Sequence, residues 1–413
     1  MSTNSLISLD FSRFVSIGDS ITSGYTDGAL FYEGQLNAFS NLLAQQFKLF
    51  GGRMFNQPLL NPESVGVGFY GNSRLVFKTN DDRSDSCLGM PTYVSKCGDL
   101  SAFVENVFEK QGPFHNMSVP SAKLISLRKE GIGNPKNGTG NYNPFFTRMA
   151  SNPESASILS DALALDPTFF TLFIGNNDVL TYASSGGTMD FITPSDGDAG
   201  IGFNKSLEEV VNMLIENGAQ GAIANLADIT SVPYFTVIPY DGLFLTKQQA
   251  DNLNSKYKNE GLSFHEGKNP FVINDTTNNN QSIRQIKKGE LIILEIQLNP
   301  DKNKYLKAEL PIPKNYVLTL SEIININNAL NSYNDFIKYM ADQKKLAFVD
   351  VNSFTKSLKP EIIFDELTLC TSYHEDRIFS LDGLHLNAKG QLFLANIFIK
   401  AINTNYSCSV PLL

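Results

Sequence analysis

The stretch Phe14-Val-Ser-Ile-Gly-Asp-Ser20 begins as a short apolar run and ends in a polar turn. Short apolar runs that stop at Gly and Asp are typical of buried strands in parallel sheets, so Phe14–Ile17 predicts a strand. Ser20 then lies just past the carboxyl end of that strand, where open α/β sheets place their ligands. A serine there can also cap a helix, so the turn taken alone leaves both a structural and a functional interpretation open.

Strand-like and helix-like segments alternate along the rest of the chain, which indicates an α/β fold with a parallel sheet. We expect further strands at Phe169–Ile174, Ala222–Leu226 and Leu346–Val349. Apolar residues at helical spacing predict helices at Asn37–Leu49, Phe203–Gly218, Ser321–Lys344 and Leu386–Ala401, with Ser321 as the N-cap of the third.

Two stretches interrupt this alternation, at about residues 52–114 and 233–315. The first is rich in Gly, Asn, Asp and Ser, and the second combines a helix-like Thr246–Lys258 with a strand-like Glu290–Ile296. A chain of 413 residues has room for one large domain or two to three small ones. We interpret both stretches as insertions into a single domain that spans residues 1–413.

Composition excludes several classes of protein. The chain has 33 Lys and Arg against 42 Asp and Glu, a net charge of −9, which argues against a nucleic-acid binder because phosphate neutralisation needs a basic face. It is too rich in aromatic residues and too poor in charge for a disordered chain. We find no apolar run of about 18 residues, so we expect no transmembrane helix.

A second polar motif, Asp382-Gly-Leu-His385, pairs a carboxylate with an imidazole three residues later. A serine hydroxyl is a poor nucleophile unless a base removes its proton, and a histidine does so best when a carboxylate orients its other ring nitrogen. Of the four histidines (His115, His265, His374 and His385), only His385 has an aspartate three residues before it and a helix directly after it. Taken alone, Asp-x-x-His also fits a local turn hydrogen bond.

The third motif, Gly175-Asn-Asn-Asp178, follows the apolar run Phe169–Ile174. Ester cleavage places negative charge on the carbonyl oxygen, and an asparagine amide is a suitable fixed donor to that charge. The same four residues also suit an ordinary turn.

The three motifs together, in this order, resemble the SGNH (GDSL) hydrolase family over nearly the whole chain. Gly18-Asp-Ser20 resembles its first block, Gly175–Asp178 its third and Asp382–His385 its last. The chain looks most similar to an exported branch common in Bacteroidota, and the stretches that carry this likeness are Thr26–Leu30, Asn41–Phe47, Asn225–Phe235 and Phe379–His385.

The resemblance implies a three-layer α/β/α sandwich with a mostly parallel, flavodoxin-like central sheet. It implies Ser20 as the nucleophile, His385 as general base and acid, Asp382 as the group that orients His385, and Asn177 as an oxyanion-hole donor beside the Ser20 N–H. It also implies a catalytic mechanism without metal or cofactor.

The second family block departs from the pattern. Its best match is Asn116-Met-Ser-Val-Pro-Ser121, where Ser121 stands at the position of a glycine whose N–H completes the oxyanion hole. A serine N–H can still donate, but a positive φ at this position would strain serine more than glycine.

Other motifs carry less chemistry. Gly66-Val-Gly-Phe-Tyr-Gly71 fits GxGxxG but lacks the strand before it and the helix after it that dinucleotide binding requires. No GxSxG elbow is present, which argues against the α/β-hydrolase fold. Cys87 and Cys97 share a polar stretch and could pair in an oxidising compartment, although spacing alone does not decide this.

The sequence therefore predicts a serine ester hydrolase that acts on a small-molecule, lipid or glycan ester. A carbohydrate O-acetyl esterase, an acyltransferase and a non-catalytic surface-binding protein on the same fold remain alternatives. The resemblance implies an exported or cell-envelope protein, whereas the N-terminus shows no basic region followed by an apolar stretch, so a cytoplasmic location also stays open.

Overall fold

The computed structural model describes residues 9–77, 91–189, 191–275, 282–357, 362–365, 370–373 and 377–413. Its centre is a five-stranded sheet with the order β13-β6-β5-β1-β4. The strands are β1 (Phe14–Gly18), β4 (Asn116–Ser118), β5 (Phe169–Phe173), β6 (Gln220–Ala224) and β13 (Ala347–Val349). All neighbouring pairs are parallel. Counted along the chain, the strand order is 2-1-3-4-5, the flavodoxin-like order that was expected.

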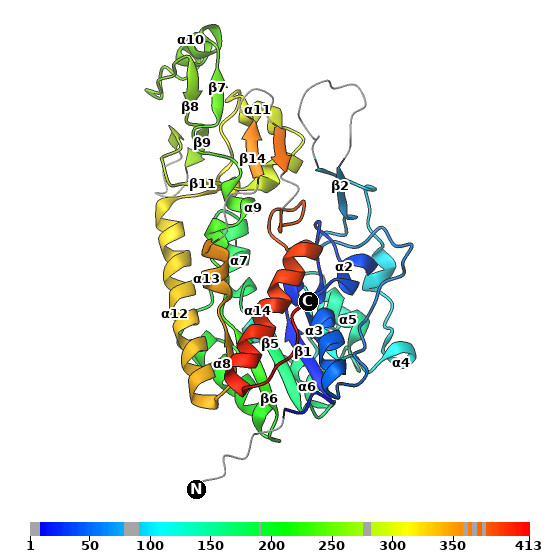
Figure 1. Cartoon of the computed structure of the whole chain (residues 1–413). Coiled ribbons are helices and arrows are strands. Elements are labelled where there is room, and N and C mark those ends of the chain that lie inside the picture. Colours follow the sequence, from blue (N-terminus) through cyan, green and yellow to red (C-terminus); the bar gives the residue numbers. More distant parts are fainter. Residues whose placement is uncertain are drawn as a thin grey trace.

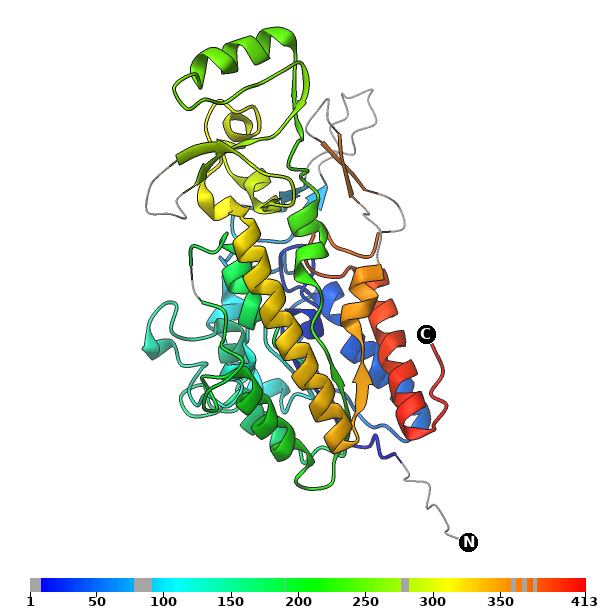
Figure 2. The same ribbon diagram turned by 90° about the vertical axis from the view of Figure 1, so that its left-hand side faces the viewer.

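Helices cover both faces of this sheet (Figure 1). On one face α3 (Phe39–Phe47) packs against α14 (Ala388–Tyr406), which also contacts β13 and β6. The other face carries α6 (Ile158–Leu163), α8 (Phe203–Ile215) and the long α12 (Leu320–Lys344), which pack on one another (Figure 2). Right-handed crossovers explain why helices lie on both faces. The strand after β1 is added on one side of β1, whereas β5, β6 and β13 are added on the other side, so the connecting helices of the two groups lie on opposite faces. The three-layer α/β/α prediction is confirmed.

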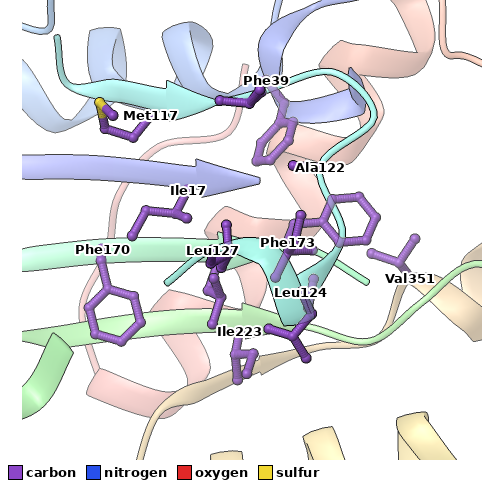
Figure 3. Packing of buried hydrophobic residues seen from close by; sticks show 14 of the residues in the cluster. Ile17, Phe39, Met117, Ala122, Leu124, Leu127, Phe170, Phe173, Ile223 and Val351 are labelled. Atoms are coloured by element: carbon purple, nitrogen blue, oxygen red, sulfur yellow. The ribbon is translucent and has the colours of Figure 1, made fainter. Parts of the chain in front are cut away.

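The core lies between these layers. Figure 3 shows side chains from four neighbouring strands, among them Ile17, Met117, Phe170 and Ile223, packing close together. The strands β1 and β5 are buried at every position, which explains why both appear in the sequence as apolar runs. Between two of the helices that cover the sheet, the buried ring of Phe203 in α8 stacks on that of Tyr333 in α12, with ring centroids 3.9 Å apart.

The two interrupting stretches add short antiparallel pairs outside the main sheet. The first contributes β2 (Leu75–Phe77) with β3 (Pro91–Tyr93) and the helix α4 (Phe108–Gln111). The second contributes the pairs β7 (Leu243–Leu245) with β8 (Gly267–Asn269), β9 (Val272–Asp275) with β10 (Ser282–Gln285), and β11 (Leu291–Ile292) with β12 (Val317–Leu318). It also holds α9 (Pro233–Thr236), α10 (Lys247–Lys256) and α11 (Lys302–Leu306).

Most buried apolar residues of the second stretch form a hydrophobic cluster separate from that of the sheet, centred on Phe271, Ile273 and Ile292. Figures 1 and 2 show this part stacked above the carboxyl edge of the sheet. Tyr234 packs against both clusters. The division of the chain into one domain with insertions stays a prediction.

Several short helices complete the fold: α1 (Ser20–Ser23), α2 (Tyr32–Leu36), α5 (Pro144–Met149), α7 (Asn177–Ser184) and α13 (Val351–Ser357). A further hairpin, β14 (Ile362–Asp365) with β15 (Cys370–Tyr373), precedes the Asp-x-x-His turn and was not expected from the sequence. The predicted helix ends differ from those observed by a few residues, most at the end of α14, which runs to Tyr406 instead of Ala401.

Two local predictions are wrong. The N-cap of α12 is Thr319 and not Ser321, because Glu322 completes a capping box with Thr319 by accepting from its N–H at 2.8 Å. The segment Glu290–Ile296 is not one strand: only Leu291 and Ile292 pair, and a 3₁₀ turn, η6 (Leu294–Leu298), follows.

Candidate active site

The three residues expected to form a catalytic triad lie in one hydrogen-bonded row. The ring nitrogen Nε2 of His385 lies 2.9 Å from Ser20 Oγ, although 365 positions separate the two residues along the chain. The other ring nitrogen, Nδ1, lies 2.9 Å from Asp382 Oδ2. Ser20 and His385 are both 4% exposed, so the row is almost fully shielded from solvent.

The position of Ser20 follows from the turn before it. Gly18 ends β1, and a Cβ atom there would lie 2.6 Å from the Phe173 carbonyl oxygen, so only glycine fits. Asp19 then caps α1 by accepting from the Ile21 N–H at 3.0 Å. Ser20 is therefore the first residue of α1 at the carboxyl edge of the sheet. A helix does start here, but its N-cap is Asp19 and not Ser20.

A tight turn aims Asp382 and His385 at each other. Gly383 has a φ of 71°, and the Ser380 N–H donates to the His385 carbonyl at 2.8 Å across the turn. Asp382 Oδ1 accepts from the backbone N–H groups of Leu384 at 2.9 Å and His385 at 2.8 Å. The carboxylate that orients the ring is thus itself fixed by the turn.

The Asp382 carboxyl stays ionised in this setting. Burial alone would raise its pKa, but the charge of His385 and hydrogen bonds from the His385 ring and from the backbone of His385 and Leu384 outweigh burial and hold the pKa well below its usual range. An ionised Asp382 accepts a hydrogen bond from the Nδ1–H of the neutral ring, which leaves Nε2 as the acceptor that faces the Ser20 hydroxyl.

A second loop, not expected from the sequence, holds the triad turn from the other side. The N–H of Gly28 donates to Asp382 Oδ2 at 2.8 Å, and the N–H of Asp27 donates to Ser380 Oγ at 3.0 Å. In return, Asp27 Oδ1 accepts from the Leu381 N–H at 2.9 Å. Asp27 and Gly28 both have positive φ, as in a type I′ turn, and the Asp-Gly pair is the sequence signal that could have located this loop.

Tyr25 packs against His385 from within the same loop. Its ring centroid lies 4.7 Å from that of His385 and 4.6 Å from that of Phe69, on which it stacks. The Tyr25 hydroxyl donates to the Gly28 carbonyl at 2.5 Å. Burial and the nearby Asp382 charge raise the pKa of Tyr25, so it remains a neutral packing partner of the imidazole.

Asn177, the expected oxyanion donor, is the first residue of α7 and is 6% exposed. Its amide Nδ2 donates to the Ala122 carbonyl at 3.0 Å, which joins the third motif to the residue after Ser121. Next to it, Asn176 Nδ2 donates to Asp19 Oδ2 at 2.9 Å and joins the third motif to the first. Neither Asn176 nor the Asp19 side chain was predicted from the sequence to have a role, because neither local turn reveals the long-range bond.

Two buried carboxyls support these turns. Burial raises the pKa of Asp19 to about 6, although hydrogen bonds from Asn176 and Ile21 oppose the shift. Burial likewise raises the pKa of Asp178 to about 6 against hydrogen bonds from Leu124 and Thr193. Asp178 Oδ2 accepts from the Leu124 N–H at 2.7 Å, which ties α7 to the chain just after Ser121.

Ser121 has a φ of 62°, the left-handed conformation that glycine adopts with less strain. Asn143 Nδ2 donates to its hydroxyl at 3.2 Å and to the Pro120 carbonyl at 2.8 Å, which holds the serine in this conformation. Among the described residues, no acceptor takes the backbone N–H of Ser121 or that of Ser20. Both groups are free to donate to a ligand.

We expect Ser121→Gly to keep at least half of the wild-type kcat/KM for a short-chain ester. Glycine removes a left-handed strain of about 1–2 kcal/mol, partly offset by the greater freedom of the unfolded chain, so the melting temperature should stay equal or rise. Esterase assays and thermal melts test this. Ser121→Ala, which keeps the strain and loses the hydroxyl, is the matched control, and a large loss of activity in both variants would show that the hydroxyl itself has a role.

A mainly apolar pocket opens beside Ser20 and encloses about 630 Å³ including its mouth. Asp19, Asn176, Asn177 and His385 line it together with Ser20, and its remaining walls are almost entirely hydrophobic. It lies at the carboxyl edge of the sheet, where flavodoxin-like folds bind their ligands.

The other candidate residues lie elsewhere. His115 Nδ1 accepts from the Asn56 N–H at 3.2 Å, and the exposed His265 ring contacts the Glu266 carbonyl. His374 and Cys87 lie outside the described residues, so the possible Cys87–Cys97 pair stays a prediction. The Gly66–Gly71 segment leads into strand β2 and not into a helix, so the flanks of a dinucleotide loop are missing.

Within the described ranges, no group of three or more His, Cys, Asp or Glu side chains is arranged to hold a metal ion. In the same part of the chain, no helix has both the length and the hydropathy that crossing a lipid bilayer requires.

No family model matches the chain, and no curated protein matches it. Two solved structures resemble it over nearly its whole length. One is LAE5, described as an alpha/beta hydrolase enzyme from the metagenome of Lake Arreo, Spain, at 13% identity and a TM-score of 0.36, covering 94% of this chain and 93% of that one. The other is an extracellular lipase from Streptomyces rimosus, at 11% identity and a TM-score of 0.35, covering 95% and 98%. Both TM-scores are below 0.5, so the proposal below depends on the geometry of the site.

Proposed function

We propose that the protein is a serine ester hydrolase with Ser20 as nucleophile, His385 as general base and acid, and Asp382 as the orienting carboxylate. The observation that carries this proposal is the unbroken row of hydrogen bonds from Ser20 Oγ through His385 to Asp382, each of 2.9 Å. Nucleophile, base and orienting group at hydrogen-bond distance define the arrangement that activates a serine.

The chemistry follows from this row. His385 Nε2 takes the Ser20 hydroxyl proton while Oγ attacks the ester carbonyl carbon, and the tetrahedral intermediate forms. His385 then gives that proton to the departing alcohol oxygen, which leaves an acyl group on Ser20. Water repeats the two steps with His385 again as base and acid, and it releases the carboxylic acid and free Ser20.

Three donors are assigned in this proposal to the carbonyl oxygen as it becomes negative. They are the N–H groups of Ser20 and Ser121 and the second hydrogen on Asn177 Nδ2, whose first hydrogen is held by the Ala122 carbonyl. Because the bond to Ala122 fixes the amide in advance, little reorganisation is needed as charge develops. In other enzymes each such donor stabilises the transition state by about 2.7–4 kcal/mol.

We further propose that the chain is an SGNH-type hydrolase. The sheet order, with the nucleophile after the first strand and the Asn177 turn after the third, supports this, as does the Asp-x-x-His turn directly before α14. The nucleophile turn reads Gly18-Asp-Ser20, without the GxSxG elbow of α/β hydrolases. Tyr25, Gly28 and Ser380 are positioning residues in this proposal, because they contact His385 or Asp382 and not the reacting atoms.

The purified protein is expected to hydrolyse p-nitrophenyl acetate and p-nitrophenyl butyrate without added metal and in the presence of a chelator. Release of p-nitrophenol with saturation kinetics supports the proposal. No release above the rate of a heat-denatured sample with either ester would contradict it.

A further inference from the structure

The apolar pocket beside Ser20 has two chemically different ends. Its polar groups form one connected cluster, because Ser20 bonds to His385 and Asp19 bonds to Asn176. Away from this cluster, most of the walls come from four elements: α7, the 3₁₀ turn η5 (Ile229–Ser231) with its flanks, α13 and α14. The residues of these walls are Leu180, Ala227, Ile229, Val232, Phe354 and Leu394, with others from the neighbouring turns.

The walls offer almost no hydrogen-bonding partner to a ligand. Thr355 is the polar residue among them, and its hydroxyl already accepts from the Asp228 N–H at 3.1 Å and donates to the Asn352 carbonyl at 2.9 Å. A sugar ring in this space would lose its water without replacement hydrogen bonds, which is costly. A hydrocarbon chain loses nothing there and gains by leaving water.

The pocket also has more apolar wall than an acetyl group can contact, because twelve apolar residues line it. Leu180, Phe354 and Leu384 are only partly buried, so apolar side chains continue to the surface of the site. An acetyl ester would leave most of this apolar surface uncovered.

We propose that this pocket binds the alkyl chain of the substrate's acyl group, so that the enzyme prefers esters of medium-chain fatty acids over acetyl esters. This inference rests on the proposed function. Ser20 and Asn177, the groups assigned to the carbonyl carbon and carbonyl oxygen, both line the pocket. The acyl chain stays attached to Ser20 after the alcohol has left, so we assign the acyl chain, and not the alcohol chain, to this pocket.

The wild-type enzyme should show a kcat/KM that rises from p-nitrophenyl acetate through butyrate to octanoate, by about fourfold for each methylene group that is fully buried. Octyl acetate carries a chain of similar length on the alcohol side. Its kcat/KM should exceed that of a short alkyl acetate, such as ethyl acetate, only slightly. A kcat/KM that is flat or falls with acyl length would overturn the inference while leaving the ester hydrolase in place. A gain confined to octyl acetate would overturn the acyl assignment.

Variants of the walls locate the effect. Ala227→Phe should fill the pocket and lower the ratio of kcat/KM for octanoate to kcat/KM for acetate at least tenfold. Phe354→Ala should widen the pocket and shift the preferred chain to a longer one. Phe393→Ala is the matched control, because Phe393 lies on α14 with 40% exposure and does not line the pocket. Equal losses for acetate and octanoate in Ala227→Phe would contradict the inference.

Binding without catalysis separates this inference from the proposed function. Sodium decanoate should bind to the folded Ser20→Ala protein in a calorimetric titration, and adding Ala227→Phe should abolish that binding. If no ester is hydrolysed, the proposed function fails, and the titration still decides whether the pocket holds an alkyl chain. If decanoate gives no heat of binding with Ser20→Ala, and the wild-type enzyme shows a kcat/KM that does not change with acyl length, the proposal that the pocket binds an alkyl chain is wrong.

Discussion

Ser20→Ala is expected to lower kcat for p-nitrophenyl butyrate by about 10⁴-fold or more, to the level of the uncatalysed reaction plus what binding and the oxyanion donors supply. Alanine removes the atom that forms the acyl bond and leaves its surroundings intact, because within the described residues Ser20 Oγ makes a single hydrogen bond, at 2.9 Å to His385 Nε2. Stopped or continuous p-nitrophenol assays on variants with unchanged melting temperature measure the loss.

His385→Ala should cost a similar factor, and the double variant should be no slower than either single one, because the two groups act as a unit. Asp382→Asn should cost about 10⁴-fold as well, since an amide there favours the wrong ring tautomer. Ser118→Ala is the matched control: Ser118 is a buried serine at the end of the neighbouring strand β4, and its hydroxyl donates to the Ser16 carbonyl at 3.4 Å and not to His385. A His385→Ala variant with more than a tenth of wild-type activity would exclude His385 as the base.

Asn177→Ala is expected to lower kcat by about 10²–10³-fold with KM changed little, because the lost donor acts on charge that develops only in the transition state. The Ala122 carbonyl also loses its bond from Asn177, so some stability is lost. Asn254→Ala controls for that loss, since the Asn254 amide likewise donates to a backbone carbonyl, that of Phe264 at 2.9 Å, but in the second inserted stretch.

A rise in KM with an unchanged kcat in Asn177→Ala would mean that Asn177 binds substrate in the ground state only.

The sequence predicts those parts of the site that short local motifs determine. Gly18 and Ser20, Asn177, and the pair Asp382 and His385 each belong to a turn that follows a strand or precedes a helix, and each turn has a recognisable composition. Because the carboxyl ends of parallel strands meet at one edge, local motifs were enough to predict a common site.

Other parts of the site depend on contacts between distant segments that no local pattern encodes. The bond from Gly28 to Asp382 joins residues 354 positions apart, and the bond from Asn176 to Asp19 joins residues 157 apart. Each partner is an ordinary turn residue in its own segment. The separate cluster of the second interrupting stretch, at about residues 233–315, was missed for a similar reason, since its strands have two to four residues and are too short to show a period.

The N-cap of α12 was predicted wrongly because two residues near the start of this helix could both serve as its cap. Thr319 and Ser321 are both suitable caps, and the choice is decided by a glutamate three residues after the cap, which Thr319 has in Glu322 and Ser321 lacks. The lysine beside this cap is also buried: Lys314 Nζ lies 2.9 Å from Glu322 Oε1. Glu322 therefore serves both the cap and an ion pair.

Covalent labelling of the nucleophile tests the central claim most directly. A fluorophosphonate should react with the wild-type protein in a one-to-one ratio, with Ser20 Oγ forming the bond to phosphorus and fluoride leaving, and hydrolysis should be lost in parallel. Peptide mass spectrometry is expected to place the added mass on Ser20, and neither Ser20→Ala nor His385→Ala should react at a comparable rate. A label on a different residue in the active protein, or undiminished hydrolysis by Ser20→Ala, would contradict the account.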